Sequence, residues 1–125
     1  MRNLDIPQTA STPLISCDPT VRILRITGES YPENAFEFYA PSISWVKECL
    51  AEQGELHVDI NVSYLNSSST KCMLDLLDLL EEAHVAGARV AVAWRYDREN
   101  PRSFDLAKEF QEDITLPFSI IAFDE

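Results

Sequence analysis

The chain has 125 residues, of which 46% are apolar and 25% charged, which is typical of one globular domain with a single core. Its formal net charge of −11 disfavours nucleic acids and anionic membranes as partners, because both are themselves negative. No stretch has the length of a membrane span or of a signal-peptide core, and we therefore expect a cytoplasmic protein.

The cysteines and histidines predict neither a disulfide framework nor a metal site. Cys17, Cys49 and Cys72 are an odd number, are widely spaced and form no C-x-x-C motif. His57 and His84 lie far apart and form no cluster with a cysteine. We therefore expect no metal and no cofactor.

The N-terminal part predicts a loose arm followed by a β-hairpin. Residues 1–10 are polar and irregular and are expected to form the arm. Residues 12–17 and 21–26 predict two strands joined by a turn at 18–20. Gly28 is expected to end the second strand.

An amphipathic helix is predicted between Asn34, its expected N-cap, and Gly54, its expected C-terminal stop. Pro41 falls inside this run but off the apolar stripe. It predicts either a kinked helix or a short turn followed by a helix from Pro41. The stripe recurs at spacings of three and four and consists of Phe36, Tyr39, Ile43, Val46 and Leu50.

The clearest strand covers residues 55–65, where apolar and polar residues alternate. This period predicts one buried face and one polar face, so helices are expected to cover mainly one face of the sheet. The apolar set is Leu56, Val58, Ile60, Val62 and Tyr64.

A Leu-rich helix is predicted from about Ser68 to Ala86, before Gly87. Its expected core stripe is Met73, Leu76, Leu77, Leu80 and His84. Its outer surface is expected to be mostly acidic and consists of Asp75, Asp78, Glu81 and Glu82, with Cys72 and Leu79 among them.

The C-terminal part predicts a strand over 89–96, a helix that starts at Asn100-Pro101, and a last strand over 118–123. The complete order is β-β-α-β-α-β-α-β. Strands that alternate with helices after an initial hairpin predict an α/β fold with a mostly parallel sheet.

Four consecutive hydroxyl residues, Ser67 to Thr70, stand where the 55–65 strand passes into the Leu-rich helix. Free backbone N–H groups and the positive end of the helix dipole favour an anion at such a junction. That anion could be a bound phosphate or a phosphate ester of one of these side chains. Ordinary N-capping, which needs only one such residue, is the alternative explanation.

The same residues do not predict catalysis. A nucleophilic Ser67 or Ser68 would need the glycines of a nucleophile elbow and a histidine base. Glycines are absent from both flanks, His57 belongs to the polar face of a strand, and His84 belongs to a helix stripe. We therefore expect neither serine to be a catalytic residue.

Five blocks spread over nearly the whole chain form a specific pattern. They are Gly28-Glu29-Ser30-Tyr31-Pro32-Glu33-Asn34, Tyr64-Leu65-Asn66-Ser67-Ser68-Ser69, Leu79-Leu80-Glu81-Glu82-Ala83-His84, Trp94-Arg95-Tyr96-Asp97 and Pro117-Phe118. This pattern resembles the SiaC family of bacterial regulatory phosphoproteins. The resemblance implies one STAS-like (SpoIIAA-like) regulatory domain over residues 1–125, the fold of anti-sigma-factor antagonists.

The resemblance also implies a partner switch that is not itself an enzyme and has no catalytic residue. In that family a cognate Ser/Thr kinase phosphorylates the hydroxyl residue after the Tyr-Leu-Asn triplet, and a PP2C-type phosphatase removes the phosphate. The unphosphorylated form binds and activates a diguanylate cyclase, which controls c-di-GMP signalling and biofilm formation. Neither nucleic acid nor membrane is expected as a partner, and a homo-oligomer is left open.

Carried onto this sequence, the resemblance makes Ser67 the phosphoacceptor, where the family relative has threonine. Other STAS antagonists use the second hydroxyl, which would select Ser68. The expected partner-binding residues are Asn66, Ser67, Ser68, Lys71, Asp75 and Asp78. Their acidic balance predicts a basic docking surface on the partner. The alternative function is an anti-sigma-factor antagonist or another STAS-type protein-binding module.

Overall fold

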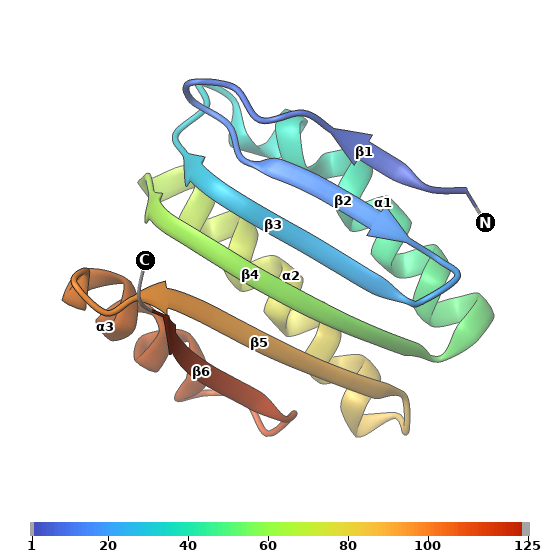
Figure 1. The fold of residues 1–125 in the computed structure, drawn as a ribbon. Helices are drawn as coiled ribbons and strands as arrows, with labels where there is room; N and C mark the ends of the chain where they lie inside the picture. The colour runs from blue at the N-terminus through green and yellow to red at the C-terminus, as the bar shows by residue number, and fades with distance from the viewer. Residues whose placement is uncertain (1, 124–125) are drawn as a thin grey trace.

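The computed structural model describes residues 2–123 and consists of one six-stranded sheet with three helices on one of its faces (Figure 1). The elements are β1 (Leu4–Ile6), β2 (Leu14–Asp18), β3 (Ile23–Ser30), α1 (Ala35–Gln53), β4 (Glu55–Leu65), α2 (Ser67–Val85), β5 (Arg89–Asp97), α3 (Pro101–Gln111) and β6 (Phe118–Phe123). The strands lie side by side in sequence order. None of the helices in residues 2–123 is both long and apolar enough to cross a bilayer.

The pairing of the strands confirms the predicted α/β architecture. β1, β2 and β3 pair antiparallel, whereas β3, β4, β5 and β6 pair parallel. Each parallel pair is joined by one helix, and all three helices lie behind the sheet in Figure 1. The hydrophobic core therefore lies between one face of the sheet and the three helices.

The first ten residues contain a strand, so the prediction of a loose arm is wrong for them. β1 pairs with β2, with Leu4 opposite Cys17 and Ile6 opposite Ile15. Leu4 and Ile6 both pack against the core. Three residues are too few for an alternating pattern to be visible in the sequence, and Met1 lies outside the described residues.

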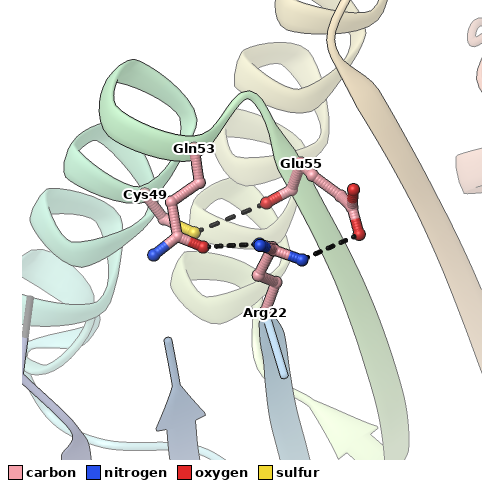
Figure 2. Close-up of polar contacts among 4 residues, drawn as sticks. All are labelled: Arg22, Cys49, Gln53 and Glu55. Carbon is pink, nitrogen blue, oxygen red and sulfur yellow. Dashed lines mark hydrogen bonds and ion pairs between the residues drawn. The ribbon is translucent and has the colours of Figure 1, made fainter. Parts of the chain in front are cut away.

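The predicted hairpin is confirmed, but its turn reaches further than expected. Val21, assigned to the second strand, is exposed, and Arg22 adopts a left-handed φ of 57°. Figure 2 shows the Arg22 side chain between the end of α1 and the start of β4. Its Nε donates to Gln53 Oε1 at 2.8 Å, and a guanidinium nitrogen lies 3.6 Å from the Glu55 carboxylate. These contacts hold the turn in a conformation that non-glycine residues rarely adopt.

Gly28 was predicted to end β3, but it forms a bulge inside this strand instead. The register with β4 shifts between Gly28 and Glu29, and pairing continues until Ser30 lies opposite Leu65. Gly28 has a φ of 127°, and a Cβ atom there would lie 2.9 Å from the side chain of Gln8. The bulge therefore needs glycine, and it carries the strand on to Ser30.

α1 is one helix that runs through Pro41, so the alternative of a helix beginning at Pro41 is wrong. The Asn34 side chain accepts the Glu37 N–H at 3.1 Å, and Gly54 ends the helix in the left-handed conformation, both as predicted. Pro41 and Glu37 are both exposed, so solvent can replace the helical donor that Pro41 lacks. Phe36, assigned to the core stripe, is 52% exposed instead.

β4 and α2 supply the centre of the core. β4 has the predicted bounds and inward face, except that Tyr64 is 51% exposed. Cys72 and Leu79 were assigned to the outer surface of α2, but Cys72 is buried and Leu79 packs against the core. His84 is only half-buried. The remaining predicted stripe is buried and consists of Met73, Leu76, Leu77 and Leu80.

α3 closes the core at the β5–β6 end of the sheet. Trp94 is fully buried, and its Nε1–H donates to Ser103 Oγ at 3.1 Å. Ser103 Oγ lies 3.3 Å from the Val62 carbonyl oxygen, so this hydroxyl joins α3 to β4. Asn100 precedes Pro101 at the helix start as predicted, but its side chain forms no capping hydrogen bond.

The inner face of α2 gives a test of this core. We expect Leu80→Ala to lower the free energy of unfolding by about 2–5 kcal/mol, because it empties a fully buried position. Leu74→Ala on the same helix is the matched control. Leu74 is 45% exposed, so this substitution is expected to lower the free energy of unfolding by less than about 1 kcal/mol. Urea denaturation followed by circular dichroism measures both, and equal losses would contradict the assigned inner face of α2.

Candidate functional site

Asn66 anchors the turn between β4 and α2. Its Oδ1 accepts the Ser69 N–H at 2.9 Å and so caps α2, and its carbonyl oxygen accepts the Thr70 hydroxyl at 3.0 Å. Its backbone N–H donates to the Ser30 carbonyl at 2.9 Å, and its Nδ2 donates to the Pro32 carbonyl at 3.3 Å. Asn66 therefore links the sequence block 28–34 to its own block, 64–69, and it is the residue that caps α2.

The four hydroxyl residues after Asn66 have different environments. Ser69 is fully buried, and the Thr70 hydroxyl is bonded back to Asn66. Ser68 is half-buried, and its hydroxyl donates to Asn66 Oδ1 at 3.3 Å. Ser67 is exposed, and within residues 2–123 its hydroxyl has no hydrogen-bond partner. Of the four, Ser67 has the hydroxyl most accessible from solution.

Three buried hydroxyl groups form a chain beneath this turn. Tyr39 Oη lies 2.6 Å from Ser30 Oγ, which lies 2.8 Å from Ser69 Oγ. Burial raises the pKa of Tyr39 to about 12, although its hydrogen bond to Ser30 opposes the rise. The chain joins α1, β3 and the first turn of α2, so it fixes the helix start that presents Ser67. Sequence reasoning missed it, because these residues lie 9 and 39 positions apart.

Two groups of exposed aromatic rings lie near the turn, one at Tyr64 before it and one at Lys71 after it. Tyr31 and Tyr64 are 42% and 51% exposed and contact each other edge to face, with ring centroids 6.0 Å apart. The Lys71 ammonium lies 5.7 Å from the centroid of the Phe36 ring, which is 52% exposed. Exposed aromatic side chains gathered in this way are typical of protein interfaces. The apolar periodicity of the sequence had predicted that Phe36 and Tyr64 face the core, which is wrong for both.

The expected partner-binding residues occupy two settings. Asn66 and Ser68 are half-buried and maintain the turn. The other four are exposed and lie on α2 at spacings of four, four and three, which places them on one face of the helix. They are Ser67, Lys71, Asp75 and Asp78.

Glu81 does not belong to the free acidic surface that the sequence predicted. Its carboxylate accepts the Thr115 hydroxyl at 2.6 Å and the Thr115 and Leu116 N–H groups at 2.8 and 3.0 Å. These hydrogen bonds, the Thr115 hydroxyl first, lower the pKa of Glu81. Glu81 thus binds the loop between α3 and β6, and Asp75, Asp78 and Glu82 remain as the exposed acids of α2.

The residues that the structure describes include no metal-ligand cluster and no exposed thiol. No three His, Cys, Asp or Glu side chains between residues 2 and 123 gather as metal ligands. All three cysteines are buried free thiols. Burial raises the pKa of Cys17 to about 12 and also raises the pKa values of Cys49 and Cys72, so these thiols stay protonated.

The buried tyrosine gives a pH test. The unfolded chain releases the Tyr39 proton near pH 10 and the folded chain near pH 12, so stability falls as the pH rises between these values. We expect Tyr39→Phe to flatten this fall by up to about 1.4 kcal/mol per pH unit, the contribution of one proton. The measurement is urea denaturation from pH 9 to 12. Tyr64→Phe, at an exposed ring, is the control, and an unchanged slope in Tyr39→Phe would contradict the role of Tyr39.

Comparisons with known proteins agree with this architecture. The model of the SiaC family regulatory phosphoprotein matches residues 6–123. An uncharacterized protein of Pseudomonas aeruginosa (strain UCBPP-PA14) is 49% identical over 126 residues, with complete coverage of both chains.

Solved structures give the same result. SiaC of Pseudomonas aeruginosa is 47% identical with a TM-score of 0.93, over 98% of this chain and 100% of that one. A crystal structure of the diguanylate cyclase SiaD with its activator SiaC, from the same organism, matches at 48% identity and a TM-score of 0.93. That match covers 96% of this chain and 99% of that one. The predicted STAS-like fold is confirmed, and the chain belongs to the SiaC family of regulatory phosphoproteins.

Proposed function

We propose that this protein is a partner-switching regulator with no enzymatic activity of its own. Its unphosphorylated form binds and activates a diguanylate cyclase. A Ser/Thr kinase phosphorylates Ser67 and thereby releases the cyclase, and a PP2C-type phosphatase resets the switch. The exchange takes place in the cytoplasm and controls c-di-GMP synthesis and biofilm formation.

One observation carries this proposal: the exposed hydroxyl of Ser67, at the first residue of α2, is free of hydrogen bonds within residues 2–123. The similarity over nearly the whole chain to a protein that was solved as a cyclase activator supports the kind of partner. Ser68 is a weaker candidate, because its hydroxyl is already bonded to Asn66 and is half-buried.

The position of Ser67 favours a phosphate electrostatically. It stands at the N-terminus of a 19-residue helix, where free N–H groups and the helix dipole stabilise negative charge. Lys71 follows four residues later on the same face, within reach of a phosphate on Ser67. In the unmodified protein the Lys71 ammonium lies over the Phe36 ring instead. Phosphorylation is therefore expected to draw Lys71 away from Phe36.

Release of the partner follows from the surroundings of Ser67. The nearby exposed rings of Tyr31, Tyr64 and Phe36 offer the partner an apolar contact. A phosphate of charge about −1.5 to −2 inside such a contact would lose its hydration, which disrupts the interface. Coupling of this kind amounts to roughly 1–3 kcal/mol, or about 5- to 150-fold in affinity.

The first test compares three forms of residue 67. Ser67→Ala is expected to bind the cyclase as tightly as the wild type, and phosphoserine incorporated at residue 67 is expected to bind about 5- to 150-fold more weakly. Isothermal titration measures the affinities, and cyclase turnover of GTP provides a second readout. Equal affinity of the alanine and phosphoserine forms would contradict the switch.

In parallel, mass spectrometry after kinase treatment should find phosphate on Ser68→Ala and none on Ser67→Ala.

A second test examines Lys71 directly. A nearby cation favours the dianion, so Lys71→Ala is expected to raise the second pKa of phosphoserine 67 by about 0.2–0.4 unit. A phosphorus NMR titration measures this pKa. Lys108→Ala on α3 removes an equal charge at an exposed position elsewhere and is the control. Identical titrations in the two variants would rule out a contact between Lys71 and the phosphate.

A further inference from the structure

A cavity of about 510 Å³ lies at the end of the sheet where β4 and β5 begin. Its lining comes from the turn before β3, the first residues of β4 and β5, the end of α2 with the loop after it, and the residue before β6. In Figure 1 β4 and β5 begin at the lower right, opposite the end of the sheet where β4 passes into α2. The rise of α2 places His84, in this cavity, about 25 Å from Ser67. We call this cavity the basal pocket.

The charges of the basal pocket are the reverse of those of the whole chain. The chain has 21 acidic residues against 10 lysines and arginines, so an average patch of its surface is acidic. The basal pocket instead contains two arginines, Arg22 and Arg89, and one acid, Glu55. Both histidines of the chain, His57 and His84, also line it. Four side chains that can donate hydrogen bonds to an anion thus meet one carboxylate.

Both arginines keep donors that a ligand can use. The Arg89 side chain is exposed and has no hydrogen bond or ion pair within residues 2–123. Arg22 uses its Nε–H for Gln53, and its ion pair with Glu55, at 3.6 Å, is longer than a hydrogen bond (Figure 2). A guanidinium carries several N–H donors in a planar fork, so those of Arg22 that point away from Gln53 remain available.

The pairing of the strands brings the two arginines to the same end of the sheet. Arg22 directly precedes β3, whose first residue pairs with His57 of β4. Arg89 pairs with Glu55 of the same strand. The backbones of the two arginines are therefore about two strand spacings, roughly 10 Å, apart, with β4 between them. Two long side chains from these positions can converge on one anion.

Two other sources of negative charge near the basal pocket are already bound. The last carbonyl groups of α2 carry the negative end of the helix dipole, but backbone N–H groups cap those of Glu82, Ala83 and His84. The carboxylate of Glu81, three residues before His84, accepts hydrogen bonds from Thr115 and Leu116. Glu55 therefore remains as the acid of the lining that opposes an anion.

We propose that the basal pocket binds a small organic phosphate, a phosphate monoester with an apolar or aromatic body. Arg22 and Arg89 hold the phosphate oxygens, and the imidazoles of His57 and His84 donate N–H groups to them. Forked guanidinium donors match the oxygen atoms of a phosphate, and two of them match its double charge. The site is separate from the Ser67 switch and does not rest on the proposed function.

The size and the remaining lining favour a body attached to the phosphate. Small-molecule sites have volumes of about 300–1,000 Å³, and a phosphate ion alone would fill only part of this cavity. The net charge of −11 repels long polyanions, so a small anion is favoured over nucleic acid. The apolar part of the lining is Val21, Leu56, Ala88, Val90, Ala91 and Pro117.

The test is an NMR titration of the unphosphorylated full chain at constant pH and ionic strength. Because the chain has only two histidines, each imidazole gives its own signal and reports on the basal pocket directly. The probes are phenyl phosphate, inorganic phosphate and benzoate. We expect phenyl phosphate to shift both signals saturably, with a dissociation constant of about 1 mM. Inorganic phosphate lacks the body and benzoate lacks the double charge, so each is expected to bind at least about fivefold more weakly.

Three variants assign the binding to the basal pocket. Arg89→Gln is expected to weaken phenyl phosphate binding about three- to fivefold, because it removes an exposed cation of the lining. Arg102→Gln removes an exposed arginine of α3 outside the pocket and is the matched control, with unchanged affinity. Glu55→Gln is expected to tighten binding about twofold, because it removes the carboxylate that repels the phosphate. A loss of folding cannot produce this gain.

The remaining outcomes would overturn the proposal. If neither histidine responds to phenyl phosphate at millimolar concentration, the basal pocket is not an anion site. If Arg89→Gln and Arg102→Gln weaken binding equally, the attraction is general and not local to the pocket. If benzoate binds as tightly as phenyl phosphate, the site takes carboxylates and the assigned ligand class is wrong. No cyclase or kinase enters this experiment, so its failure leaves the proposed function untouched.

Discussion

The hydrogen bonds of Asn66 determine how the rest of the site is arranged. The Asn66 side chain accepts the Ser69 N–H and donates to the Pro32 carbonyl. It can do both because an amide carries an acceptor oxygen and a donor nitrogen. Aspartate could cap the helix equally well, but it would lose the hydrogen bond to the Pro32 carbonyl. Since Asn66 Oδ1 accepts the Ser69 N–H and the hydroxyls of Ser68 and Thr70 are bonded to Asn66, Ser67 is left facing solvent.

The elements with strong patterns could be predicted from the sequence, and the exposed aromatic residues could not. β4 and β6 have the expected bounds because strict alternation or a short apolar run marked them, and Asn34 and Gly54 carry clear capping chemistry. Periodicity identifies apolar residues but does not say whether a residue at the end of an element faces the core or solvent. Phe36 and Tyr64 stand at such ends, and both were placed in the core.

The buried hydroxyl chain could not be predicted for a different reason. Ser30, Tyr39 and Ser69 come from three elements, and no local pattern connects them. The sequence block around Ser30 and the block around Ser69 were visible, but only the fold brings them together. Excess hydroxyl residues suggested an anion site, yet the structure gives each of three hydroxyls after Asn66 a structural bond and leaves one free.

The fixed start of α2 also bears on how a modifying enzyme recognises this protein. Ser67 already has helical geometry, with Ser69 immobilised beneath it by buried oxygen atoms. If Ser67 is phosphorylated as proposed, its kinase has to accept this preformed helix start and cannot rely on an extended peptide in its cleft. The selectivity of such a kinase would then come from the folded shape around the serine, including the tyrosine pair and Lys71, which a short sequence motif in an unrelated chain does not reproduce.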